Sequence, residues 1–213
     1  MFVIKAGIKQ MKRNFIYNTI LKTGGADVVI VRMAESNMKD YNKPNEGFMV
    51  TGRILPSYEN GLWTYTEEDF AEAYAKRYED EQIAVAYTED ESKAVFLFYN
   101  GEKCTGRIRL RANWNGYAMV EDIAVAGSRR QQGIGRRLMD QAVQWAQQHK
   151  LAGLMLETQD VNVAACRFYA RYGFEIGGVD NRLYSNFPAA GEQAIFWYYK
   201  FQGKSLDFKI KRE

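Results

Sequence analysis

The chain has few of the residues that build metal sites and disulfides. Its 213 residues include two cysteines, Cys104 and Cys166, and one histidine, His149. The cysteines form no C-x-x-C pair, so both are expected to be reduced and buried, as in a cytoplasmic protein. Ligands for zinc or iron are lacking, and no metal is expected. A Ser-His-Asp mechanism would depend entirely on His149, which is expected at a solvated helix end.

Long apolar runs and long runs of like charge are also missing. No stretch approaches the length of a membrane span, and the apolar residues at the start of the chain are interrupted by Lys5, Lys9, Lys12 and Arg13. The net charge is only +3, which does not favour a nucleic-acid partner. We therefore expect a cytoplasmic protein that binds neither membranes nor nucleic acid.

The hydrophobic share of 46% suits one sizeable core. We expect residues 1–25 to be an N-terminal extension of unclear role and residues 26–213 to be a single domain. Residues 26–34 read as a buried strand, and residues 35–62 as a mobile segment with one short helix. A helix is expected over residues 66–78, because a near capping box at its start is followed by apolar residues at helical spacing: Phe70, Ala73, Tyr74 and Tyr78.

Two Asn-Gly pairs predict the topology of the middle of the chain. Asn100-Gly101 and Asn115-Gly116 separate strand-like runs, and Asn-Gly between such runs is a strong hairpin signal. Three consecutive antiparallel strands are therefore expected, within residues 94–125. An amphipathic helix from Gly133 follows. The remaining expected elements are a buried strand over 152–157, a helix from Asn162 to Gly173, and strands over 174–179 and 194–201.

The stretch from Arg130 to Gly135, "RQQGIG", is a glycine turn that opens a helix. Such a turn can bind phosphate through free backbone N–H groups and the helix dipole. A P-loop would need Lys and Ser or Thr after the second glycine, where Arg136 and Arg137 stand. A Rossmann fingerprint would need a third glycine and a parallel βαβ unit. The turn instead fits the pattern R/Q-x-x-G-x-G/A.

This turn and a second motif resemble the GNAT superfamily of acetyl-CoA-dependent N-acetyltransferases. "VEDIAVAGSRRQQGIGRRLMDQAVQWA" resembles its strand, turn and helix, and "NVAACRFYARYGFE" matches N-x-x-A-x-x-x-Y-x-x-x-G-F from Asn162 to Phe174. The resemblance covers residues 27–201. It implies an α/β (α+β) GNAT fold with a mixed, mostly antiparallel central sheet flanked by helices and splayed at the acetyl-CoA site. The superfamily contains both monomers and homodimers.

The resemblance also implies which residues bind the cofactor. The strand before the turn would pair with the pantetheine amides through the backbone of Ile123, Ala124 and Val125. The turn would hold the pyrophosphate, and the second motif would contact the cofactor arm. The residues so implied are Arg130, Gln131, Gln132, Gly133, Ile134, Gly135 and Arg136 in the turn, and Asn162, Ala165 and Tyr169 in the second motif.

For catalysis, Tyr169 matches the family tyrosine that acts as general acid near the thioester sulfur. Glu121 and Asp122 are the candidates for base and for substrate binding; as consecutive strand residues they are expected on opposite faces, with one facing the cleft. Glu157 is a third candidate, and Tyr184 is a candidate for the acceptor pocket. A covalent intermediate on Cys166 is disfavoured, because the family transfers the acetyl group directly.

Within the superfamily, "LETQDVNVAACRFYARYGF", "LYSNFP" and "EQAIFWYYKF" resemble streptothricin N-acetyltransferases. That resemblance implies a small cationic amine as substrate, the β-lysine amine of streptothricin, and antibiotic resistance as the result. Another acceptor, such as an aminoglycoside, a polyamine or a protein N-terminus, is the alternative enzyme. A non-catalytic acyl-CoA sensor is the alternative from another class, and it would need neither Tyr169 nor an acidic cleft. Residues 35–65 are expected to wall the acceptor site.

Overall fold

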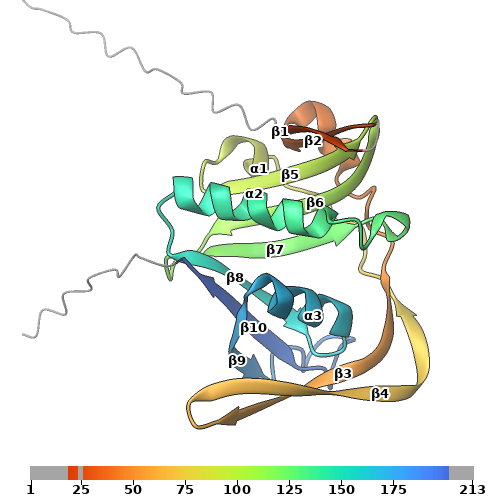
Figure 1. The fold of residues 1–213 in the computed structure, drawn as a ribbon, viewed down its shortest axis with the longest axis vertical. Coiled ribbons are helices and arrows are strands. Elements are labelled where there is room, and N and C mark those ends of the chain that lie inside the picture. The colour runs from red at the N-terminus through yellow and green to blue at the C-terminus, as the bar shows by residue number, and fades with distance from the viewer. Residues whose placement is uncertain (1–18, 24–25, 202–213) are drawn as a thin grey trace, which may run out of the picture.

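The computed structural model describes residues 19–23 and 26–201. In this part of the chain eight strands form one sheet in the order β1-β2-β5-β6-β7-β8-β10-β9 (Figure 1). Every neighbouring pair is antiparallel except β7 and β8, which are parallel, so the expected mixed, mostly antiparallel sheet is confirmed. The strands are β1 (Thr19–Thr23), β2 (Ala26–Arg32), β5 (Lys93–Asn100), β6 (Lys103–Ala112), β7 (Ala118–Val125), β8 (Gly153–Gln159), β9 (Glu175–Asp180) and β10 (Ala194–Lys200).

The sheet begins inside the segment that was expected to be an extension. Strand β1 pairs with β2 from Thr19↔Ile30 to Thr23↔Ala26. Residues 1–18, 24–25 and 202–213 lie outside the described residues, so the assignment of a role to the first 25 positions stays a prediction.

Both expected hairpins in the middle of the sheet are present. Gly101 and Gly116 have φ values of +58° and +82°, which glycine adopts without the steric cost of a side chain. These turns join β5 to β6 and β6 to β7, and they bring the end of β7 to the glycine turn.

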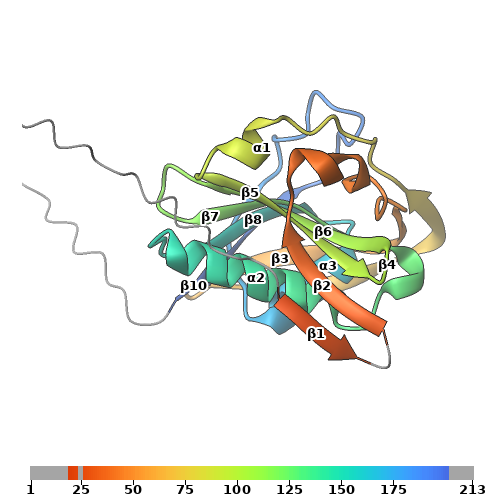
Figure 2. The same cartoon turned by 90° about the horizontal axis from the view of Figure 1, so that it is seen from above.

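The two faces of the sheet carry different layers (Figure 2). Helix α2 (Ile134–Gln148) covers one face and buries its apolar stripe, which includes Leu138, Met139 and Trp145. The 3-10 helix η1 (Glu35–Asp40) and the short helix α1 (Ala86–Glu89) lie on the other face, beside a second cluster around Tyr41 and Leu97. His149 ends α2, as expected, and is half-buried there. Cys104 and Cys166 are unpaired and buried, also as expected.

The prediction of a helix over residues 66–78 is wrong. Strand β4 (Leu62–Lys76) occupies most of this range and pairs antiparallel with β3 (Phe48–Glu59), a strand that the sequence analysis missed. The turn between them is Asn60-Gly61, with φ values of +51° and +82°, a third Asn-Gly hairpin. The local helix signals lose to cross-strand pairing, as tertiary context often overrides propensity. The short helix expected within residues 35–62 is present as η1.

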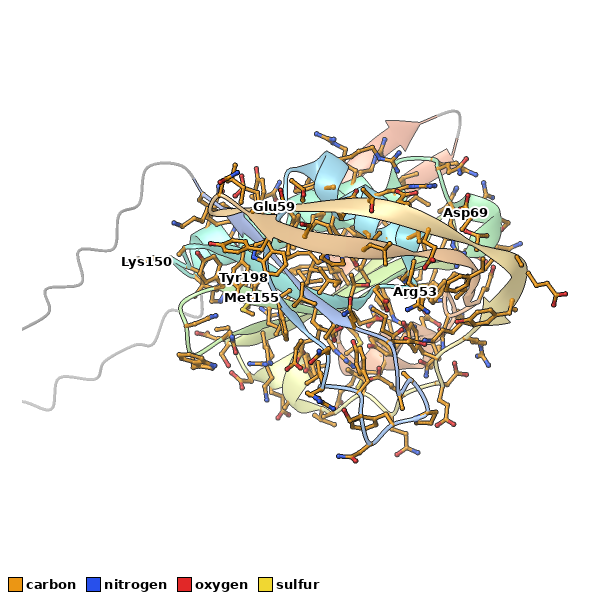
Figure 3. All side chains as sticks on the ribbon, turned by 90° about the horizontal axis from the view of Figure 1, so that it is seen from below. Arg53, Glu59, Asp69, Lys150, Met155 and Tyr198 are labelled. Atoms are coloured by element: carbon orange, nitrogen blue, oxygen red, sulfur yellow. The ribbon has the colours of Figure 1, made fainter. Side chains whose placement is uncertain are left out.

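The β3–β4 ribbon crosses the molecule beside α3 (Val163–Tyr172), β9 and β10 (Figures 1 and 3). Three kinds of contact hold it there. Ile54 donates its backbone N–H to Asp160 O at 3.0 Å, Tyr65 packs edge-on against Trp197, and Glu67 forms an ion pair with Arg167 of α3. The middle of β3 therefore lies close to the carboxyl end of β8. Among residues 19–23 and 26–201, no helix is both long and apolar enough to cross a membrane.

Candidate active site

Strands β7 and β8 separate after a short paired stretch. Their pairing runs from Ala118↔Leu154 to Val120↔Leu156, whereas β7 continues to Val125 and β8 to Gln159. The expected splay is therefore present. The β8-facing edge of β7 from Glu121 onward is left without a partner strand in the described structure. Ile123, Ala124 and Val125 lie on this open edge, where their backbone could pair with an extended ligand.

The glycine turn leaves the start of α2 open. Gly133 is the N-cap with a φ of +81°, and no side chain caps the helix. The first backbone N–H groups of a helix have no partner within the helix, so those of Ile134, Gly135 and Arg136 face outward. Gly135 has no positive φ, and a Cβ there would make ordinary contacts with Phe168 at 3.5 Å and Val125 at 4.0 Å. The absence of a side chain at Gly135 thus leaves room beside the turn. The free N–H groups at the start of α2 could therefore bind an anion there.

The side chains of Arg130 and Gln132 in the turn form hydrogen bonds with the protein itself. Arg130 donates from Nε to Val125 O at 3.0 Å, and its other end donates to Gly47 O at the start of the ribbon. Gln132 donates to Ser128 O at 3.1 Å. Gln131 has a φ of +60°, which helps to close the turn. Arg136 lies over the ring of Tyr172 in α3 at 5.6 Å, so it links the two helices that flank the splay.

The second motif places its residues as caps and core of α3. Asn162 Oδ1 accepts a hydrogen bond from Ala165 N at 3.3 Å, which confirms its N-cap geometry, and Gly173 ends the helix with a φ of +109°. Tyr169 is only 6% exposed and packs against Phe174 and Trp197. Burial, followed by the charges of neighbouring acidic groups that include Asp122, raises the pKa of Tyr169. Its phenol is therefore neutral and holds its proton.

A bulge in β7 places both consecutive carboxylates on one face. Asp122 pairs with Arg109 and Val120 pairs with Leu110, so Glu121 is an extra residue in β7. Both carboxylates bind arginines at alternate positions of β6, which share a face. The expectation that Glu121 and Asp122 point to opposite faces is therefore wrong, because it assumed a regular strand.

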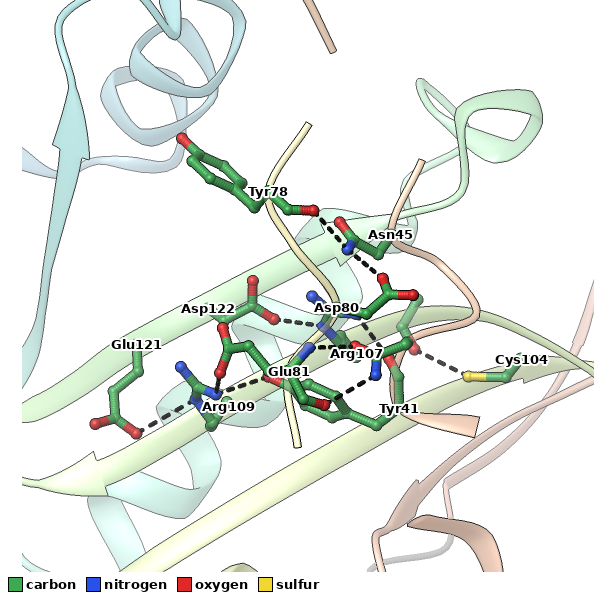
Figure 4. A network of polar contacts seen from close by, with 12 residues as sticks. Tyr41, Asn45, Tyr78, Asp80, Glu81, Cys104, Arg107, Arg109, Glu121 and Asp122 are labelled. Carbon is green, nitrogen blue, oxygen red and sulfur yellow. Dashed lines mark hydrogen bonds and ion pairs between the residues drawn. The ribbon is translucent and has the colours of Figure 1, made fainter. Parts of the chain in front are cut away.

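Arginines on that face form hydrogen bonds with both carboxylates (Figure 4). Arg107 Nε lies 2.5 Å from Asp122 Oδ2. Arg111 Nε donates to Glu121 Oε1 at 2.8 Å, and the Tyr87 hydroxyl donates to Glu121 Oε2. Burial, and then the bond to Glu121, raises the pKa of Tyr87 to about 12. Glu121 thus has a donor on each oxygen, whereas Asp122 has its one side-chain donor on Oδ2.

Glu157 lies across the splay from these two residues, at the first position of β8 after the last paired residue. It is half-buried, and the hydroxyl of Tyr184 donates to its Oε1. No described arginine or lysine forms an ion pair with Glu157. Burial raises the pKa of Glu157, although the bond from Tyr184 opposes the shift. Of the three candidate carboxylates it is thus the one without a cationic partner.

Tyr78 joins this group, although the sequence analysis placed it at the end of a helix. It follows the ribbon, and its hydroxyl donates to Gln159 Oε1 of β8 at 2.5 Å. Two residues earlier, Lys76 Nζ holds Glu192 at 2.5 Å. The overlooked signal was Asn60-Gly61, since the hairpin that it predicts carries the chain back to β8.

Residues 55–174 match the acetyltransferase (GNAT) family. The chain belongs to this family. It is 57% identical to streptothricin acetyltransferase A of Bacillus subtilis (strain 168) over 173 residues, which are 81% of this chain and all of that protein. It is 37% identical to a streptothricin acetyltransferase of Escherichia coli over 55% of this chain and 68% of that one.

A solved structure agrees with the family in fold. It is a Bacillus anthracis str. Ames protein in complex with acetyl coenzyme A, for which streptothricin acetyltransferase activity has been proposed. It superposes with a TM-score of 0.77 and 36% identity over 82% of this chain and 99% of that chain. The GNAT member described here is thus an acetyl-CoA-dependent acyltransferase.

Proposed function

We propose that this enzyme acetylates the β-lysine amine of streptothricin, and thereby confers resistance to that antibiotic. The observation that carries the proposal is the 57% identity that spans the whole of the Bacillus subtilis streptothricin acetyltransferase A. The side of the site that faces the ribbon supports it. Burial, and then the charges of Glu192, Glu157 and Asp122, raise the pKa of Tyr78 there, and of these three carboxylates Glu157 has no described cationic partner. An unpaired carboxylate at this place attracts a cationic amine.

The described residues fit acetyl-CoA at the splay. The open edge of β7 at Ile123, Ala124 and Val125 would hold the amide-bearing arm, and the N–H groups of the turn from Gln131 to Arg136 would hold the pyrophosphate. Asn162, Ala165 and Tyr169 would lie along the arm on the α3 side. When bound, the cofactor supplies an acetyl thioester that an amine can attack.

Residues of this chain would accept and donate the protons that are transferred in the reaction. Overall, an ammonium loses two protons as nitrogen gains the acetyl carbon and the carbon–sulfur bond breaks; one proton ends on the thiol and one is released. We assign the first proton to Glu157, because its raised pKa makes it a better base than an ordinary carboxylate. Tyr169 keeps a proton available at its buried hydroxyl. Asp122 would bind the amine through Oδ1, and Glu121 would hold the bulge.

Free-thiol release from acetyl-CoA tests the proposal. The purified protein is incubated with streptothricin, and in parallel with kanamycin and spermidine. Rapid release with streptothricin alone is the expected result. Release only with another amine would replace streptothricin as the acceptor. No release with any amine, together with tight binding of acetyl-CoA, would favour a non-catalytic acyl-CoA sensor.

A further inference from the structure

We propose that Tyr78 is a specificity-determining residue that accepts a hydrogen bond from the reacting ammonium group, with Gln159 fixing its orientation. This inference rests on the proposed function, because it names the group that selects the amine. The segment that carries Tyr78 was assigned no such role by its sequence.

The backbone on both sides of Tyr78 is anchored (Figure 4). Asn45 Nδ2 donates to the carbonyl of Tyr78 at 3.0 Å, and Arg77 Nε donates to the carbonyl of Asn45 at 3.0 Å. Three residues further on, Glu81 forms an ion pair with Arg109 of β6. These contacts fix the segment against the sheet, so the Tyr78 ring projects from a rigid support toward β8.

The hydroxyl of Tyr78 is arranged to accept hydrogen bonds. Its single proton goes to Gln159 Oε1 at 2.5 Å, and Gln159 is only 9% exposed. A hydroxyl has one donor and two acceptor lone pairs, so the oxygen of Tyr78 offers only acceptors to a ligand. The Tyr78 residue as a whole is 47% exposed, although its hydroxyl is hydrogen-bonded to the buried Gln159 side chain.

Three carboxylates lie near this oxygen: Glu192 is paired with Lys76 and Asp122 with Arg107, whereas Glu157 has no described cationic partner. Desolvation, and then the charges of Glu192, Glu157 and Asp122, raise the pKa of Tyr78. Tyr78 is in turn among the groups that raise the pKa of Tyr169 and of Tyr184. The Tyr78 oxygen therefore lies near the residues that we assign to proton transfer and to binding of the acceptor. An ammonium group satisfies acceptor-only oxygens and carboxylates together, whereas a hydroxyl or an amide product does so less well. The site would thus favour the charged substrate over its neutral product.

The test compares Tyr78→Phe with Tyr58→Phe, a matched control at the tip of the ribbon, where Tyr58 is 59% exposed. Tyr78→Phe is expected to raise KM for streptothricin by about tenfold or more, since a hydrogen bond to a charged group is lost. KM for acetyl-CoA should stay that of the wild type, and the thermal midpoint should fall only modestly, because the variant also leaves the buried Gln159 Oε1 without its donor. Tyr58→Phe should change none of these values.

Gln159 gives a second pair of variants. Gln159→Leu removes the acceptor for the Tyr78 proton and is expected to raise KM for streptothricin, whereas Gln159→Glu keeps an acceptor oxygen and should retain most of the affinity. An unchanged KM in Tyr78→Phe would overturn the inference.

Calorimetric binding of streptothricin to the enzyme with coenzyme A, without turnover, separates the two proposals. If the wild type binds or acetylates a different amine, the proposed acceptor fails, and Tyr78→Phe is then scored with that amine. If the wild type binds none of the three amines, both the proposed function and the inference fail.

Discussion

Arg107 and Asp122 form an ion pair in which the guanidinium Nε lies 2.5 Å from the carboxylate Oδ2. The Arg107 side chain is 4% exposed and that of Asp122 is 20% exposed. Arg107 also donates to the carbonyl of Tyr41 at 2.7 Å and lies over the Tyr41 ring. This one side chain therefore joins the strand that carries Asp122 to the layer on the opposite face from α2.

Removal of either partner should destabilise the enzyme strongly. Arg107→Met leaves Asp122 without its cation, and Asp122→Asn leaves a buried guanidinium without its anion; each is expected to lower the free energy of unfolding by about 3–5 kcal/mol. Urea denaturation measures the effect. Lys93→Ala is the control, since its pair with Asp90 is long, at 3.7 Å, and far more exposed; about 0–1 kcal/mol is expected there. Equal losses in all three variants would contradict this assignment.

Glu157→Gln should abolish most of the acetyl transfer. Loss of the proton acceptor is expected to lower kcat by at least about a hundredfold. In the wild type, kcat/KM should rise with pH through a carboxyl pKa above the ordinary 4.5, and this rise should be absent from the residual activity of the variant. A pH–rate profile with the same acidic limb in both proteins would assign the base elsewhere.

Glu157→Gln should also stabilise the folded protein at neutral pH. Because burial raises the pKa of Glu157 in the folded state, the unfolded chain gives up this proton first as pH rises. As pH rises from 4.5 to the raised pKa of Glu157, the wild type therefore loses stability, whereas Glu157→Gln does not. Thermal midpoints of the two proteins should diverge as pH rises through this window and agree more closely below it. A constant difference at every pH would contradict the shift.

Cys166 should be dispensable for catalysis. It is fully buried, and burial raises its pKa to about 12, so little thiolate is present near neutrality. Cys166→Ala is expected to keep kcat within about twofold of the wild type, because the loss of a small buried group acts on stability instead. Mass spectrometry of the enzyme mixed with acetyl-CoA should find no acetylated cysteine. A trapped acetyl-cysteine would establish a covalent route.

Local signals carried the prediction of the fold where each element is marked by its own residues. Asn100-Gly101 and Asn115-Gly116 marked two hairpins, and Asn162 and Gly173 marked the ends of α3. The same approach failed over residues 66–78, where helical spacing conflicted with the hairpin signal of Asn60-Gly61. That conflict could have been resolved from the sequence.

The geometry around the carboxylates could not be predicted in the same way. Glu121 and Asp122 share a face only because the β6–β7 register shifts by one residue, and no local pattern in the sequence marks that shift. The position of Tyr78 depends on Asn45 and Arg109, which are distant in sequence. The open edge of β7 and the glycine turn could be predicted from the sequence, because both belong to a family motif.

Gly133 and Gly61 offer a matched pair for testing the cofactor turn. Their φ values are +81° and +82°, and a Cβ at either position would meet nothing within 4 Å. Gly133→Ala and Gly61→Ala should therefore each lower the free energy of unfolding by about 1–2 kcal/mol, the usual strain of a left-handed residue with a side chain. Only Gly133 begins α2 at the proposed pyrophosphate site, so only Gly133→Ala should raise KM for acetyl-CoA, as measured by thiol release at saturating amine. If both variants lose stability but neither changes this KM, the turn does not hold the cofactor's phosphates. A rise in both would mean that strain at the ribbon tip reaches the site, and the specific role of Gly133 would then be lost.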